Sequence, residues 1–155
     1  MGMDVNGLNP ENEKGEYFRN NCWWWRPLWA YCCNAAPEII NGELASAGGA
    51  NDGAGLKTAK ECKQLAHTLR YLNDSKQTKE YEKRYKARMK AMPDVECKFC
   101  NATGTRTDLG DKPTKCNACH GKGFERPSET LYPFDTKNVE EFVEFLENCG
   151  GFEIC

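Results

Sequence analysis

Apolar residues recur with the 3.6-residue period of a helix in three stretches of the chain. In the first stretch they follow Thr58 and form one helix face. They are Cys62, Leu65, Ala66, Leu69 and Leu72. Thr58 and Glu61 have the spacing of a capping box, in which each side chain satisfies a free backbone N–H group of the first turn. The pattern therefore predicts a helix that begins after Thr58.

Two later stretches repeat this period. One follows a polar break at residues 73–75 and ends before Pro93. Its apolar stripe consists of Tyr81, Tyr85, Met89 and Met92. The other begins near Asn138, and its apolar face consists of Val139, Phe142, Val143, Leu146 and Cys149. Gly150 and Gly151 supply a left-handed stop, after which residues 152–155 are expected to return as a short strand or tail on the core.

Residues 20–29, NNCWWWRPLW, contain all four tryptophans of the chain. Pro27 suits the first turn of a short helix that ends near Cys33. Three consecutive helical residues fan through about 200°, so the three adjacent indoles cannot all point into one core. At least one indole is therefore expected to meet solvent, a loop or a ligand.

Two stretches have no regular apolar pattern. Residues 1–16 are polar and predict a loosely held arm. Residues 41–55, NGELASAGGANDGAG, predict a loop of unusual length for a compact domain, which is typical of function or disorder.

Together the patterns predict a mainly α fold (α+β): a small helical domain with an inserted four-cysteine zinc hairpin module and a few short strands. The expected divisions are a polar N-terminal arm (1–16), an aromatic and helical body (17–93), the zinc hairpin module (94–127), and a C-terminal helix and tail that pack on the body (128–155). Homo-oligomers are also expected, because a chain of this size with so many aromatic residues has difficulty burying all of them alone.

The charge and the hydropathy narrow the class of protein. The net charge is −2, so the whole molecule is not a general electrostatic trap for nucleic acid or anionic membrane. No apolar run reaches the ~18 residues of a membrane span, and the first residues do not read as a signal peptide. We therefore expect a cytoplasmic protein without a membrane partner.

The chain contains ten cysteines, and three roles are compared for them: a disulfide framework, a redox dithiol and a metal site. Four of them form the pattern Cys-x2-Cys-x15-Cys-x2-Cys, which suits tetrahedral Zn²⁺ better than either alternative. The predicted ligands of one structural zinc are Cys97, Cys100, Cys116 and Cys119. Four thiolates leave no open position for water, which argues against zinc-dependent hydrolysis.

The remaining cysteines are expected to act as small buried apolar residues. They are Cys22, Cys32, Cys33, Cys62, Cys149 and Cys155. His120 could replace a thiolate or donate to a sulfur, but an exposed side chain is the favoured interpretation.

Segments 97–104, CKFCNATG, and 116–123, CNACHGKG, resemble the Cys-x-x-Cys-x-Gly-x-Gly repeats of the cysteine-rich region of DnaJ-type chaperones. The second segment matches fully, whereas the first has Ala102 in place of a glycine. DnaJ-type regions pair four repeats around two zinc ions, so two repeats imply one zinc. The His-Pro-Asp signature of a J domain is missing, and the resemblance therefore implies a zinc hairpin alone, not a chaperone.

Arginines and asparagines near the tryptophans suggest a ligand-binding surface, because an aromatic plane beside a guanidinium can stack a base and hold a phosphate or carboxylate. The candidate residues are Arg19, Asn20, Trp23, Trp25, Arg26, Asn51 and Asp52. The alternative is an aromatic core with arginines extending over it to solvent.

A basic stretch at residues 76–90 suggests a second kind of surface, which could follow the phosphates of a nucleic acid. Its candidate residues are Lys79, Lys83, Arg84, Lys86 and Lys90, with Lys112, Lys115 and Lys122 on the zinc arm. The alternative is a solvated helix face with i,i+4 ion pairs, Glu80–Arg84 and Glu82–Lys86.

Catalytic motifs are missing. GGANDGAG lacks the Gly-Lys-Ser/Thr ending of a phosphate-binding loop, and no His-x-Glu accompanies the zinc cysteines. FRNNCWWWRPLW, NDGAGL, the paired cysteines and the closing GGFEI make residues 17–155 similar to a set of small uncharacterised proteins encoded by bacteriophages and bacteria. This resemblance implies a phage source and interference with a host defence system.

The sequence therefore predicts a non-enzymatic, zinc-stabilised binding protein that binds a host protein or sequesters a nucleotide-like signal. The alternative is a nucleic-acid-binding zinc protein that uses the basic helix at residues 76–90.

Overall fold

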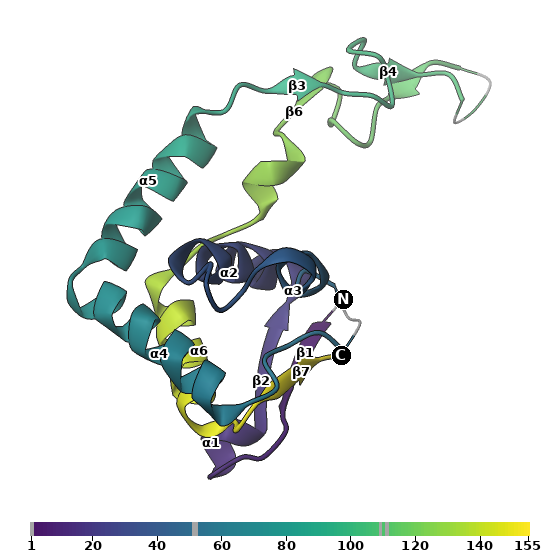
Figure 1. Cartoon of the computed structure of the whole chain (residues 1–155). Coiled ribbons are helices and arrows are strands. Elements are labelled where there is room, and N and C mark those ends of the chain that lie inside the picture. Colours follow the sequence, from purple (N-terminus) through teal and green to yellow (C-terminus); the bar gives the residue numbers. More distant parts are fainter. Residues whose placement is uncertain (1, 51–52, 109, 111) are drawn as a thin grey trace. The chain divides into compact units, whose positions relative to one another are not determined.

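The computed structural model describes residues 2–50, 53–108, 110 and 112–155, and it confirms the predicted α+β class (Figure 1). The chain forms two compact units. The first, here the main unit, comprises Met1–Lys86 and Tyr132–Cys155. The second, here the cysteine unit, comprises Ala87–Leu131.

The main unit contains a three-stranded antiparallel sheet with the order β2-β1-β7. Its strands are β1 (Gly2–Gly7), β2 (Tyr17–Asn21) and β7 (Phe152–Ile154). Val5 of the central strand lies opposite Phe18 on one side and Ile154 on the other, and all three side chains are buried. The prediction of a loosely held arm at residues 1–16 is therefore wrong. The ladder pairs the backbone of β1 on both edges, and Met3 and Val5 anchor it in the core.

Helices form the rest of the main unit. They are α1 (Glu13–Glu16), α2 (Cys22–Ala35), α3 (Gly42–Ala47), α4 (Ala59–Asp74), α5 (Gln77–Ala91) and α6 (Thr136–Asn148), and α5 continues into the cysteine unit after Lys86. The capping box of Thr58 and Glu61 is confirmed at the start of α4. Gly150 and Gly151 have the expected positive φ after α6, and the tail that follows is the strand β7.

Two predicted details differ from the structure. Helix α2 begins at Cys22, earlier than a helix with Pro27 in its first turn, because the Asn21 side chain accepts hydrogen bonds from the backbone N–H groups of Trp23 and Trp24, both at 3.1 Å. Pro27 therefore lies inside the helix. The predicted loop 41–55 contains the short helix α3, whose N-cap is Asn41.

Aromatic side chains of α2 and α6 meet at the centre of the main unit. The Trp25 ring stacks on Trp29 with their centroids 5.6 Å apart, and it meets the Phe142 ring edge-on at 5.5 Å. The two indole N–H groups also bind the segment around α3: Trp25 donates to the carbonyl of Gly48 (2.6 Å) and Trp29 to that of Ala45 (3.0 Å). The tryptophans thus both fill the core and hold α3 in place.

A buried carboxylate links α5 to the start of α6. Glu82 accepts hydrogen bonds from the backbone N–H (3.2 Å) and hydroxyl (2.6 Å) of Thr136, and it pairs with Lys79 (3.0 Å) and Lys86. Burial alone would raise the pKa of this carboxyl, but the hydrogen bonds from Lys86, Thr136 and Lys79 outweigh burial and lower the pKa to about 2. The ionised form therefore stabilises the fold.

The contribution of Glu82 to the stability of the fold in acid can be measured with one substitution. Because the pKa is lowered on folding, the stabilisation is complete above the ordinary value of 4.5 and disappears as the pH falls towards 2. We expect the free energy of unfolding of the wild type to fall by about 2 kcal/mol more than that of Glu82→Gln over this interval. Urea titrations followed by tryptophan fluorescence report on the main unit, which holds all four indoles. Parallel pH profiles of the two proteins would contradict the assignment.

The six cysteines outside the zinc pattern differ in their exposure to solvent. Cys32, Cys62 and Cys149 are buried, as predicted, whereas Cys22 and Cys33 are half-buried and Cys155 is exposed.

Within the described residues, no helix has both the length and the apolar character needed to cross a bilayer.

The cysteine unit contains two short two-stranded antiparallel sheets. In one, β3 (Val95–Glu96) pairs with β6 (Phe124–Glu125); in the other, the hairpin strands β4 (Thr105–Arg106) and β5 (Thr114–Lys115) pair. A 3-10 turn, η1 (Ser128–Leu131), follows β6. The unit is wider than the predicted 94–127, because the Arg126 guanidinium donates to the carbonyls of Met89 and Met92 and so attaches the end of α5.

Candidate functional site

The two small sheets of the cysteine unit place its two Cys-x-x-Cys turns face to face. The backbone N–H of Cys97 donates to the carbonyl of Gly123 (2.8 Å), and that of Cys116 donates to the carbonyl of Gly104 (2.9 Å). Each turn therefore begins where the other ends. This reciprocal pairing brings together four cysteines that are distant in pairs along the sequence.

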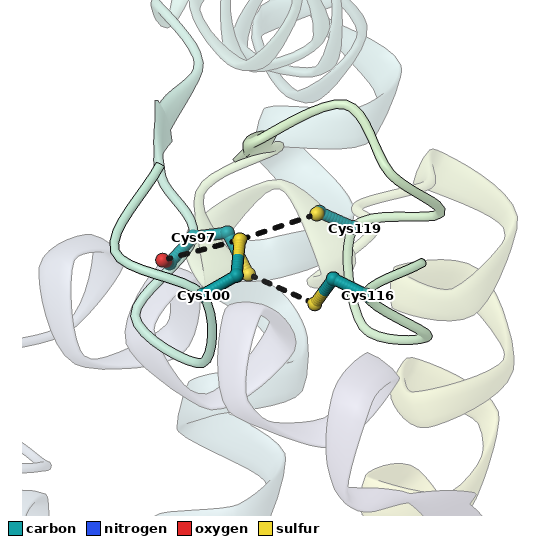
Figure 2. A group of neighbouring side chains, drawn as sticks. All are labelled: Cys97, Cys100, Cys116 and Cys119. Atoms are coloured by element: carbon teal, nitrogen blue, oxygen red, sulfur yellow. Dashed lines mark hydrogen bonds between the residues drawn. The ribbon is translucent and has the colours of Figure 1, made fainter. Parts of the chain in front are cut away.

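The four sulfurs form one compact group (Figure 2). Cys97, Cys100, Cys116 and Cys119 are all buried, and their Sγ atoms lie within 4.8 Å of one another. The Cys97–Cys116 and Cys100–Cys119 sulfurs are 3.9 and 3.7 Å apart. A tetrahedral ion with Zn–S bonds of about 2.3 Å places its sulfurs about 3.8 Å apart. The spacing suits four ligands of one metal ion, and the four cysteines are a candidate metal site.

Backbone N–H groups support negative charge on the sulfurs. Gly104 N–H donates to Cys100 Sγ (3.3 Å), and Gly123 N–H donates to Cys119 Sγ (3.2 Å). Burial raises the pKa of the Cys119 thiol, but the hydrogen bond from Gly123 and the neighbouring thiols Cys100 and Cys116 outweigh burial and lower the pKa to about 7. At Cys119 the deprotonated sulfur, which is the form that binds a metal, is thereby favoured.

The backbone of the two turns shows why this motif favours glycine. Gly121 in the second turn has a φ of 78°, and Ala102 occupies the equivalent position of the first turn with a φ of 63°. A left-handed conformation costs a residue with a Cβ about 1–2 kcal/mol. The first turn therefore keeps the geometry of the motif at some cost in backbone strain. His120 also has a positive φ, and its side chain is exposed.

The structure brings two of the predicted ligand-binding residues together on the main unit. Trp23 is 40% exposed, and its ring lies 4.9 Å from that of Tyr132. The Arg26 guanidinium lies over the same tyrosine ring at 5.8 Å and donates to the Tyr132 hydroxyl at 2.8 Å. Trp23, Arg26 and Tyr132 are hereafter called the aromatic cluster. Sequence reasoning missed Tyr132, which no local pattern connects to α2.

The other predicted residues of this surface have different environments. The prediction is wrong for Trp25, whose indole is completely buried and bonded to Gly48. Arg19 is exposed and faces Asp4 at 3.8 Å, while Asn20 donates its amide to Asn138 at 2.8 Å. Asn51 and Asp52 lie outside the described residues.

Two hollows meet at Asn20. One, of about 440 Å³, is lined by Gly2, Arg19, Asn20 and Asn21. The other, of about 250 Å³, is lined by Asn20, Trp24, Asp135, Lys137, Asn138 and Glu141. Trp24 was not among the predicted residues. Its position one helical step from buried Trp25 was the available signal that it faces outward.

The predicted nucleic-acid face on α5 is partly neutralised. Lys79 and Lys86 both pair with buried Glu82, so they serve the junction with α6. Lys83, Arg84 and Lys90 are exposed, and within the described part of the chain they make no ion pair or hydrogen bond. The predicted pair Glu82–Lys86 is confirmed.

Comparisons of the chain with protein-family models, curated proteins and solved structures found no match. The function is therefore argued from the metal site and the exposed surfaces.

Proposed function

We propose that the chain is a non-enzymatic binding protein, stabilised by one structural Zn²⁺, that recognises a protein partner through the aromatic cluster. The donor set supports zinc, because four buried thiolates at tetrahedral spacing are the usual ligands of structural zinc. All four positions would be filled by protein sulfur, so the ion would fold the cysteine unit rather than bind a substrate.

The observation that carries the binding role is the ordered aromatic cluster. Trp, Tyr and Arg are the residues most enriched at energetic centres of protein interfaces. Here Tyr132 is fixed through its carbonyl, which accepts a hydrogen bond from the Tyr85 hydroxyl at 2.7 Å, and Arg26 is held by the Tyr132 hydroxyl. An exposed indole beside an immobilised guanidinium loses little conformational entropy on binding.

Affinity capture tests this proposal. The zinc-loaded chain is immobilised and exposed to a bacterial extract, and retained proteins are identified by mass spectrometry. The double variant Trp23→Ala/Arg26→Ala is expected to lose a protein that wild type retains, with affinity for the purified partner reduced at least ~30-fold. Tyr71→Ala is the matched control, because Tyr71 is an aromatic residue on α4 that is 63% exposed. Equal retention by the double variant and the wild type would contradict the role of the cluster.

A nucleotide-like ligand is a second candidate, favoured by the two hollows that share Asn20. Arg19 could hold a phosphate, and Trp24 offers an aromatic plane in the neighbouring hollow. Native mass spectrometry after incubation with a nucleotide extract would show a retained mass that Arg19→Ala abolishes.

The phage source, the interference with a host system and the cytoplasmic location stay predictions, because they rest on the sequence alone.

A further inference from the structure

The cysteine unit displays an aromatic ring at its metal site. Phe99 lies between Cys97 and Cys100 in the first turn, and it is 63% exposed. Burial of a phenylalanine side chain contributes about 1.5–3 kcal/mol, so an exposed ring forgoes a stabilising contact. A fixed turn holds the ring outward, because both flanking cysteines are buried ligand positions.

A guanidinium backs this ring. The Cζ atom of Arg106 lies over the Phe99 ring at 5.6 Å from its centroid. Arg106 is held by Asp108, whose Oδ1 accepts from Nε at 2.8 Å, and by Asn117, whose Oδ1 accepts from Nη1 at 3.3 Å. The guanidinium is largely buried, with its side chain 15% exposed. One face of the ring is thus covered by a fixed cation, and the remaining surface is open.

The charges around the ring favour an anionic ligand. Residues 97–123 contain five Lys or Arg and two Asp. Asp108 is engaged with Arg106, whereas Lys98, Lys115 and Lys122 are exposed and make no ion pair within the described residues. A buried zinc tetrathiolate would carry −2 and leave this segment at +1. An open aromatic plane among cations is the arrangement that binds single-stranded nucleic acid.

We propose that Phe99, backed by Arg106, is a stacking platform for a base of single-stranded nucleic acid, and that the lysines of the same hairpin hold the adjoining phosphates. This site lies within the cysteine unit and is independent of the aromatic cluster of the main unit. A duplex has no free base face for such a ring, so single strands are preferred.

Fluorescence anisotropy with the full zinc-loaded chain tests the proposal. The probes are a labelled oligothymidylate and oligouridylate of about 12 nucleotides and a duplex of equal length. Phe99→Ala is expected to weaken single-strand binding ~5- to 150-fold, since one base–aromatic stack contributes about 1–3 kcal/mol. Phe99→Leu keeps the apolar bulk and should also weaken it, whereas Tyr71→Ala should bind like wild type. Zinc content of each variant is measured to show that the turn is intact.

Several outcomes would overturn the proposal. They are the absence of oligonucleotide binding by zinc-loaded wild type at low salt, equal affinity of Phe99→Ala and Tyr71→Ala, and a preference for duplex. If oligonucleotides do not bind, but a protein partner binds wild type and binds Phe99→Ala more weakly, the occupant of the site is a polypeptide instead. The double variant Trp23→Ala/Arg26→Ala keeps Phe99. Its affinity for the oligonucleotides should therefore equal that of wild type.

Discussion

Replacement of Cys116 by serine is expected to abolish metal binding and the fixed structure of residues 97–123. Among the described residues, the apolar cluster of this unit consists of the four cysteines themselves with Ala118 packed against them, so the metal is expected to supply most of its stability. Structural zinc contributes about 10–16 kcal/mol to the folding of such small units, which is more than a hairpin of this size can replace. Hydrogen exchange with mass spectrometry should show protection of residues 97–123 lost.

The same experiment separates the two units of the chain. The main unit has its own core, which includes Trp25, Phe142 and Ile154, and its protection should persist in Cys116→Ser. Cys155→Ser is the matched control, because Cys155 is exposed and outside the metal site. Metal analysis of the control should give one zinc per chain. Unchanged protection of residues 97–123 in Cys116→Ser would contradict a metal-dependent fold of this unit.

Trp25→Ala is expected to have the largest effect on the main unit. The substitution removes a completely buried indole, its stacking on Trp29 and its hydrogen bond to Gly48. Loss of such a side chain costs about 3–5 kcal/mol. A domain of this size has about 5–15 kcal/mol of stability, so the variant should lose about a fifth or more of its free energy of unfolding.

Trp23→Ala provides the contrast within the same helix. Trp23 is 40% exposed, and its removal should cost less than ~1 kcal/mol. Urea unfolding of both variants, followed by far-ultraviolet circular dichroism with zinc present, gives the two free energies. Similar losses for Trp23→Ala and Trp25→Ala would show that the two indoles are not divided between surface and core.

Local patterns in the sequence were sufficient for the metal site and several helices. The cysteine spacing determines a site because the ligands of each turn are neighbours in sequence, and the Thr58 capping box needs only three residues of separation. The distinction between Trp23 and Trp25 was also present in the sequence. Trp25, Leu28, Trp29 and Cys32 are spaced as one helix face, and all four are buried.

Non-local pairing accounts for what was missed. The segment GMDVNG has only two apolar side chains, and it becomes a central strand because β2 and the distant β7 both pair with it. Tyr132 joins Trp23 and Arg26 by tertiary packing, and Arg106 of β4 folds back over Phe99 of the first cysteine turn. None of these contacts has a period or a spacing that a single sequence reveals.

The order of strands in the main sheet has a consequence for the chain as it leaves the ribosome. β1 is synthesised well before residues 152–154, which pair with one of its edges. The cysteine unit lies between them in the sequence and needs only its own residues and a metal ion. We therefore expect the cysteine unit to be able to fold during translation before the main sheet closes, because closure requires residues 152–154 to have emerged.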